Sequence, residues 1–274
     1  MSLIDTLHPI EDEGLFHFEG LLSTARKMAA YDNLGVSIIA RNCETTIGKT
    51  LKAVEELSGY FAKTAVVVYT NDCTDGTVGA IDSTKVDEDI NFLHVDETLG
   101  FPDLSGSRKS TRTINIAHCR NEALSYLPGD TDAVLVLDAD LLEVTAERLL
   151  AGYGEMIEWS YDAMAGQNLV RASVLEPRRL VSYDAFAFRP TWTERSNYMI
   201  ERSFHYDVRP AGVQAYRVRS AFGGACWYTG DVYFDGRQYN GEHGCEHVAF
   251  NRGLLMGISP SMSVIGFIDS GVNR

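Results

Sequence analysis

The stretch Ala133-Val134-Leu135-Val136-Leu137-Asp138-Ala139-Asp140 decides the fold, because an apolar, mostly branched run ends abruptly in two carboxylates. A short run of this kind predicts a strand that is buried on both faces. Alternate residues of an extended chain point to the same side, so Asp138 and Asp140 can reach one point beyond the carboxyl end of the strand. In an open α/β sheet, ligands bind at that edge.

Two interpretations of the aspartates are open. Close carboxylates repel each other unless a cation lies between them, and hard oxygen ligands with open positions suit Mg²⁺ or Mn²⁺ that bridges substrate phosphates. Alternatively, Asp140-Leu141-Leu142-Glu143 matches an acidic capping box, so that Asp140 would start the next helix. The cap gives Asp138 no role, and the short motif alone does not decide between the two.

Composition limits the classes of partner. The chain has 274 residues, of which 45% are hydrophobic, so it can bury a sizeable core. A net charge of −14 argues against a nucleic-acid or anionic-membrane binder, and any bound phosphate must be met by a metal or by local arginines. Five widely spread cysteines, no apolar leader and no membrane-length apolar run lead us to expect a soluble, cytoplasmic protein without a transmembrane segment.

Strands and helices alternate in the first half of the predicted fold. Residues 1–34 predict an N-terminal helical extension. Strands are expected at 36–40, 64–69, 91–95 and 133–137, and helices at 45–61 and 113–127. We therefore predict an α/β fold, in which one Rossmann-like domain over 35–274 has a mostly parallel central sheet flanked by helices.

The second half is less regular, and we expect it to shape the substrate site. Helices are predicted at 143–160 and 246–256, and strands at 163–170, 180–188 and 215–228. The domain then divides into a nucleotide-binding half, 35–140, and a substrate half, 141–274.

Other motifs are less specific. Gly48-Lys49-Thr50 resembles the end of a P-loop, but that motif requires glycine at position 43, which is Cys43. Gly223-Gly224 marks either a close approach of backbone to ligand or a bulge. A zinc site of His243, Cys245 and His247 would fit none of the usual ligand spacings.

Basic residues of the loop 100–110 and the following helix could meet phosphate. The loop is rich in Gly, Ser and Pro, so we expect it to be mobile without ligand and to order over the substrate, with Arg108, Lys109 or Arg112 contacting phosphate. Arg112 and Arg120 are either solvated or diphosphate partners.

Taken in order, these motifs resemble a GT-A-fold glycosyltransferase over about residues 35–265. The resemblance is strongest to the fungal capsule-associated mannosyltransferases and related viral and bacterial enzymes. The segments that carry it are Ala40-Arg41-Asn42, Asn71-Asp72-Cys73-Thr74-Asp75-Gly76-Thr77, Arg120-Asn121, Asp138-Ala139-Asp140, Gly223-Gly224 and Cys245-Glu246-His247.

The resemblance implies a metal-dependent hexosyltransferase, with mannose as one candidate sugar, that moves a sugar from a nucleotide-diphosphate donor to a carbohydrate or other hydroxyl acceptor. Asp138 and Asp140 would hold Mn²⁺ or Mg²⁺ on the donor. The nucleotide-binding residues would be Ala40, Arg41, Asn42, Asp72, Arg112 and Arg120.

The acceptor side follows from the same resemblance. Glu246 would be the general base of an inverting enzyme, and Gly223 and Gly224 would lie against the sugar or acceptor. A Glu-His pair replaces the more usual Glu-Asp, so His247 is either a third metal ligand or a histidine that caps a buried helix end. The sequence does not distinguish inversion from retention.

Two other functions share a similar nucleotide half. A sugar-phosphate nucleotidyltransferase would be expected to have a glycine- and lysine-rich loop after the first strand, where this chain has Arg41-Asn42-Cys43-Glu44. A non-catalytic carbohydrate-binding relative would bind sugar without turnover.

Overall fold

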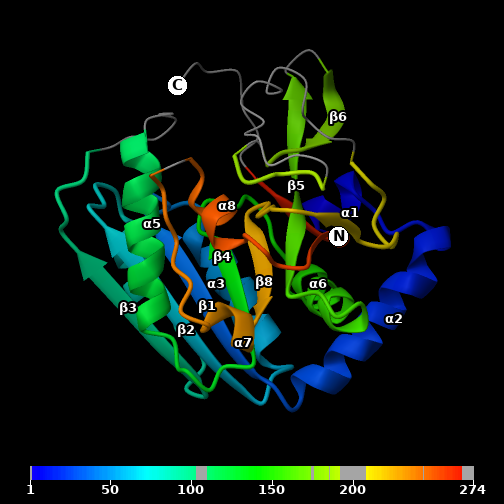
Figure 1. Cartoon of the computed structure of the whole chain (residues 1–274), viewed down its shortest axis with the longest axis horizontal. Helices are drawn as coiled ribbons and strands as arrows, with labels where there is room; N and C mark the ends of the chain where they lie inside the picture. The colour runs from blue at the N-terminus through cyan, green and yellow to red at the C-terminus, as the bar shows by residue number, and fades with distance from the viewer. Residues whose placement is uncertain are drawn as a thin grey trace.

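A nine-stranded sheet runs through the protein in the order β3-β2-β1-β4-β8-β5-β9-β7, with β6 paired to β5 (Figure 1). The computed structural model describes residues 2–102, 110–173, 176–184, 186–191, 208–242 and 244–266. The strands are β1 (Asn33–Ala40), β2 (Lys63–Asn71), β3 (Ile90–Glu97), β4 (Ala133–Asp138), β5 (Ala163–Ser173), β6 (Glu176–Ser182), β7 (Tyr216–Val218), β8 (Ala225–Thr229) and β9 (Met256–Ile265). The helices are α1 (Leu3–Leu7), α2 (Asp12–Ala29), α3 (Ile47–Ser58), α4 (Thr77–Asp82), α5 (Ser110–Ser125), α6 (Ala146–Glu158), α7 (Gly230–Tyr233) and α8 (Glu246–Phe250).

The first half of the sheet is parallel and the second half is mixed. The pairs β1–β2, β1–β4 and β2–β3 are parallel, as the alternation of strands and helices predicted. Beyond β4, β8 runs antiparallel to both β4 and β5, whereas β5 and β9 are parallel. The predicted class, one α/β domain in which helices flank a large sheet, is confirmed.

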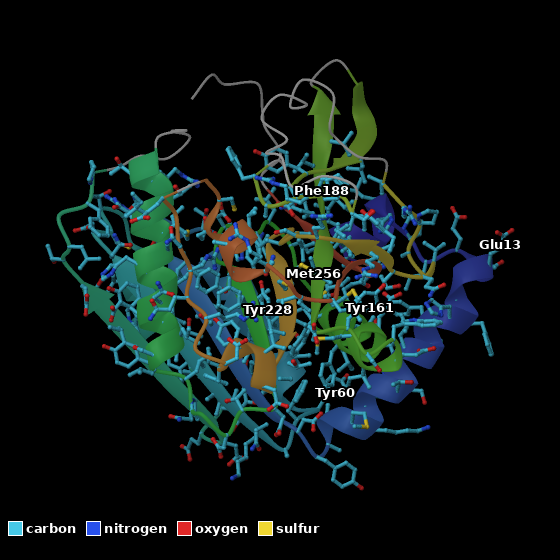
Figure 2. The ribbon with its side chains drawn as sticks, viewed as in Figure 1. Glu13, Tyr60, Tyr161, Phe188, Tyr228 and Met256 are labelled. Atoms are coloured by element: carbon cyan, nitrogen blue, oxygen red, sulfur yellow. The ribbon has the colours of Figure 1, made fainter. Side chains whose placement is uncertain are left out.

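Each central strand buries both faces, which explains its continuous apolar sequence. In β4, Leu135 and Leu137 belong to one hydrophobic cluster and Val134 and Val136 to the other. The first cluster includes side chains from α2, α3 and α6, and the second includes side chains from α5 and α8. Figure 2 shows Tyr228 of β8 and Met256 of β9 in the interior, while Glu13 of α2 projects at the periphery. The sheet is therefore the middle layer of a three-layer domain.

The helix after β4 begins later than a cap at Asp140 requires. Helix α6 starts at Ala146, and its N-cap is Thr145, whose hydroxyl accepts the amide N–H of Arg148 at 3.4 Å. Asp140 lies six residues before that start and caps no helix. The capping-box interpretation of Asp140 is therefore wrong, and the metal-site interpretation stays a prediction.

Three predictions for the second half need correction. The predicted strand 180–188 ends at Ser182, and the predicted strand 215–228 is two short strands, β7 and β8, separated by the Gly223-Gly224 turn. The predicted helix 246–256 ends at Phe250, because Met256–Ile265 forms β9, a strand whose residues are all buried. Gly257 and Pro260, residue types that commonly follow the end of a helix, lie inside this strand.

The N-terminal helices pack on the sheet domain. In Figure 1, α2 runs along the outside of α6, and the two helices make close contact. The approach is close enough that a methyl group at Gly154 of α6 would overlap the backbone carbonyl of Leu21 in α2. Glycine is therefore required at Gly154 by packing.

We predict that Gly154→Ala lowers the free energy of unfolding by about 1–3 kcal/mol, since overpacking forces the helices apart. Gly20→Ala is the matched control, because Gly20 lies on the exposed side of α2 and nothing lies within 4 Å of an added methyl group there. The control should be neutral or stabilising, as alanine favours helix over glycine. Urea unfolding measures both, and equal stability of the two variants would contradict this account of the α2–α6 interface.

Candidate active site

The acidic pair lies at the carboxyl end of the parallel strands. Asp138 is the last residue of β4, and its backbone N–H donates to the carbonyl of Gly224 at 2.9 Å. Through the register of β4 with β1 and of β1 with β2, the same edge holds Ala40 and the segment around Asp72. The Asp138 side chain is 33% exposed, and Asp140 is exposed. The predicted edge therefore carries the predicted carboxylates.

A buried arginine joins the acidic pair to the last helix. From α5, Arg120 places Nη2 at 3.1 Å from Oδ1 of Asp138 and Nε at 3.3 Å from Oε1 of Glu246. The side chains of Arg120 and Glu246 are only 5% and 7% exposed. One guanidinium thus bridges a carboxylate of β4 and a carboxylate of α8. Neither the Asp138-Ala139-Asp140 motif nor the Cys245-Glu246-His247 motif predicted this contact.

Aromatic rings enclose this guanidinium. Arg120 lies over the ring of Phe222, with 4.7 Å between the guanidinium carbon and the ring centroid, and 5.9 Å from that of Tyr239. Phe222 in turn stacks on His247, with centroids 3.9 Å apart and an interplanar angle of 15°. The rings exclude water, which strengthens the ion pairs and holds the guanidinium plane.

The carboxylates carry more negative charge than Arg120 neutralises. Burial, with smaller contributions from the charges of Asp140 and Glu246, raises the pKa of Asp138 to about 7, although Arg120 lowers it. Burial also raises the pKa of Asp140, against the lowering by Arg112 and Arg120. Burial alone would lower the pKa of Arg120, but Asp138 and Glu246 raise it overall.

This donor set fits a divalent cation. Asp138 and Asp140 offer hard oxygen ligands. A bound cation would lower their raised pKa values, because it favours the ionised form of each carboxylate. Among the described residues no three His, Cys, Asp or Glu side chains group together as a metal site, and the end of β4 offers two carboxylates. Mg²⁺ and Mn²⁺ accept such a site, because they take their other ligands from phosphate and water.

The ends of β1 and β2 hold the start of the segment that follows β3. Asp72 accepts the amide N–H groups of Gly100 at 2.9 Å and Phe101 at 3.0 Å. Arg41 donates to the carbonyls of Phe101 at 2.8 Å and Pro102 at 3.2 Å. Two predicted nucleotide-binding residues therefore clamp the backbone beside the site.

Left-handed backbone marks the same strand ends. Asn42 has φ 56° and Asp72 has φ 49°, values that cost energy in residues other than glycine. The side chain of Asn42 accepts the amide N–H of Thr74 at 2.8 Å, which links the two strand ends. Such strain clusters at ligand sites.

The other predicted residues lie nearby, with their roles untested. Neither ring nitrogen of His247 has a hydrogen-bond partner among the described residues, and burial beside Arg120 holds its pKa well below the ordinary value. Gly223 and Gly224 have φ 62° and 77°, and a methyl group at Gly223 would overlap the carbonyl of Gly166 in β5. Internal packing therefore requires glycine at Gly223. Arg108, Lys109 and His243 lie outside the described residues.

Sequence reasoning missed Asp184, a buried carboxylate behind the Gly223-Gly224 turn. It accepts the amide N–H groups of Phe222 at 2.7 Å and Ala187 at 3.3 Å. Burial raises the pKa of Asp184 to about 7, although these amides and the charge of Arg189 lower it. The local sequence Tyr183-Asp184 has no motif that would have revealed this role.

Comparison with known proteins gives matches at the level of structure. No protein-family model matches the sequence, and no curated protein matches it. TarS 1-349 from S. aureus in complex with UDP-GlcNAc is 15% identical, with a TM-score of 0.52 over 88% of this chain and 61% of that chain. Mannosyltransferase PcManGT from Pyrobaculum calidifontis, in complex with GDP-Man and Mn²⁺, is 14% identical, with a TM-score of 0.51 over 91% of this chain and 65% of that one.

The chain has the GT-A fold. At this identity the likeness concerns the fold, and the chain spans less than two thirds of the length of either structure. In this GT-A domain, none of the helices that the structure describes is long and apolar enough to cross a membrane.

We predict that Asp184→Asn makes stability less dependent on pH. The pKa of Asp184 rises from 3.8 to about 7 on folding, so the native state holds the proton longer and the parent loses stability as pH rises from about 4 to 7. The amide does not titrate. Urea unfolding at several pH values should therefore give a shallower decline for the variant, and parallel curves would show that Asp184 titrates normally in the folded protein.

Proposed function

We propose that the chain is a metal-dependent glycosyltransferase that moves a sugar from a nucleotide-diphosphate donor to a hydroxyl acceptor, with a carbohydrate as the first acceptor class to test. The observation that carries the proposal is the Asp138 and Asp140 pair at the end of β4, next to the Arg120–Glu246 pair. The fold supports it, because a structure with the same fold holds GDP-Man and Mn²⁺. A hexose donor, mannose included, and a relation to the fungal capsule-associated mannosyltransferases belong to the same proposal.

In this proposal, Asp138 and Asp140 hold Mn²⁺ or Mg²⁺. The bound cation would neutralise charge on the departing nucleotide diphosphate. On α5, the charge of Arg112 lowers the pKa of Asp140, and Nη1 of Arg120 has no hydrogen-bond partner among the described residues. Both arginines are therefore candidates to donate to phosphate, and His247 is the candidate third ligand.

The nucleotide would lie over the ends of β1 and β2. Ala40 and Asn42 offer backbone and amide groups there, and Asp72 offers carboxylate oxygens. Arg41 has both terminal nitrogens bonded to the backbone of Phe101 and Pro102, so it shapes this surface. A preformed surface binds with less loss of conformational entropy.

On the acceptor side, Glu246 is the proposed base of an inverting reaction. The attacking hydroxyl would pass its proton to the Glu246 carboxylate as its oxygen forms the new bond to the sugar carbon. Arg120 donates a charge-assisted hydrogen bond to this carboxylate and orients it. Gly223 and Gly224 would bring backbone close to the sugar or acceptor.

A panel of nucleotide sugars with and without Mn²⁺ tests the proposal. UDP-, GDP- and dTDP-linked sugars should be screened by thermal shift, since a ligand that binds the native state raises its stability. Release of free nucleotide on addition of acceptor identifies a transferase. Pyrophosphate exchange would identify a nucleotidyltransferase, and binding without either reaction would identify a carbohydrate-binding protein.

We predict that Asp140→Ala weakens Mn²⁺-dependent donor binding more than about tenfold, or 1.4 kcal/mol, while the fold survives. Isothermal titration calorimetry with the donor, in the presence and absence of Mn²⁺, measures the affinity of the variant and of the parent. Glu143→Gln is the control, because Glu143 accepts the Leu3 and Ile4 amides and lies away from the proposed ligands. His247→Ala should reduce the Mn²⁺ dependence if His247 is a ligand. Unchanged binding by Asp140→Ala, with and without chelator, would rule out the metal site.

We predict that Glu246→Gln keeps Mn²⁺-dependent donor binding and lowers the transfer rate about 10²–10⁴-fold, the usual contribution of a general base. Glu242→Gln is the matched control, since Glu242 is exposed and lies four residues earlier. Transfer is measured by nucleotide release at saturating donor and acceptor. Parent-like turnover in Glu246→Gln would remove this residue as the base.

A further inference from the structure

Asp184 lies behind the catalytic edge and fixes one backbone segment. Its Oδ2 accepts the amide N–H of Phe222 at 2.7 Å, and the amide of Gly223 faces the same carboxylate. Next in the chain, the carbonyl of Gly224 accepts the backbone N–H of Asp138. The Phe222-Gly223-Gly224 turn is therefore anchored by Asp184 on one side and by the end of β4 on the other.

The ring of Phe222 carries this anchoring to the charged centre. The Phe222 ring stacks on the ring of His247, with 3.9 Å between the centroids, and the guanidinium carbon of Arg120 lies 4.7 Å from the Phe222 centroid. The guanidinium reaches Asp138 and Glu246 at 3.1 and 3.3 Å, so a displaced ring would tilt the plane that makes both bonds. A planar guanidinium that donates to two carboxylates from two different nitrogens tolerates little rotation, because hydrogen bonds weaken as they lose alignment.

We infer that Asp184 is a positioning residue: it fixes Phe222, and through that ring it sets the Arg120 guanidinium between Asp138 and Glu246. The inference rests on the proposed function only where it concerns turnover. No contact to substrate is assigned to Asp184. A carboxylate suits the task because it accepts several amide N–H groups at once, which an apolar side chain cannot do.

The first measurement is independent of activity. In ¹⁵N-arginine-labelled protein, the Nε–H signal of Arg120 is assigned by its loss in Arg120→Lys. Because this N–H is buried and donates to Glu246, it should exchange slowly with solvent in the parent. Asp184→Ala and Phe222→Ala should each shift this signal and speed its exchange.

Gln167→Ala is the matched control. Gln167 is another fully buried polar side chain that clamps backbone, since it bonds both the N–H and the carbonyl of Arg209. Its loss should lower the melting temperature and leave the Arg120 signal unchanged. If Asp184→Ala does not fold, Asp184→Asn and Phe222→Leu are measured instead. Asparagine has one acceptor oxygen where aspartate has two, and leucine removes the aromatic ring on which Arg120 and His247 pack.

The second measurement is a double-mutant cycle on turnover. Asp184→Ala and Phe222→Ala should each lower kcat between about tenfold and a hundredfold with donor KM little changed, as expected for a small misplacement of catalytic groups. The double variant should lose no more than the worse single variant, because both changes act through one contact chain. Gln167→Ala should keep the parent kcat.

The outcomes separate the two proposals. An Arg120 signal that Asp184→Ala leaves unchanged would overturn the positioning role, and so would losses in kcat that multiply in the double variant. If the signal responds as expected while the parent transfers no sugar from any donor, the proposed function fails and the positioning role stands.

Discussion

The buried guanidinium of Arg120 is the constraint on which the site depends. A charge with 5% exposure is stable only when its partners are in place, and those partners come from β4 and α8, 18 and 126 residues away in sequence. Removing one partner of a buried ion pair costs about 3–5 kcal/mol, so the packing of α5, β4 and α8 is coupled through this one side chain. Two carboxylates, Asp138 and Glu246, contact it directly, and the charge of Asp140 acts on Asp138, so the site holds more carboxylates than cationic partners.

The parallel half of the fold could be predicted because its strands bury both faces. A strand with apolar residues on both faces, such as β4, has a continuous run of branched apolar residues in its sequence. The helices between the strands have apolar residues at ordinary helical spacing. β9 could not be recognised in the same way. Ser259, Ser261 and Ser263 alternate with apolar residues, a pattern typical of a half-exposed strand, yet all of these serines are buried. Their hydroxyls find partners inside the protein: those of Ser259 and Ser261 accept the amide N–H groups of Met262 and Gly212, and that of Ser263 donates to the carbonyl of Pro260.

The site could be predicted where one element carries it and not where the fold assembles it. Asp138 and Asp140 share a strand end, so their spacing alone places them together. The contact of Arg120 with Glu246 depends on how α8 packs against α5, which no local pattern encodes. An aspartate after β6, such as Asp184, indicates at most a turn, which its bond to the Ala187 amide fits; its second contact, with the Phe222 amide, appears only in the folded structure.

The two sides of the site differ in how complete they are without a ligand. At the ends of β1 and β2, the left-handed residues Asn42 and Asp72 are held by bonds to Thr74, Gly100 and Phe101, so that surface is already satisfied and rigid. At the end of β4, loss of solvent around the carboxyl groups raises the pKa values of both aspartates, although nearby arginines lower them. The preformed surface at the ends of β1 and β2 favours a ligand of matching shape. The carboxylates at the end of β4 favour a ligand that brings positive charge. The donor of the proposed function, a nucleotide diphosphate with a divalent cation, would meet both requirements, since its base and ribose would lie on the fixed surface and its cation would compensate the charge of the carboxylates.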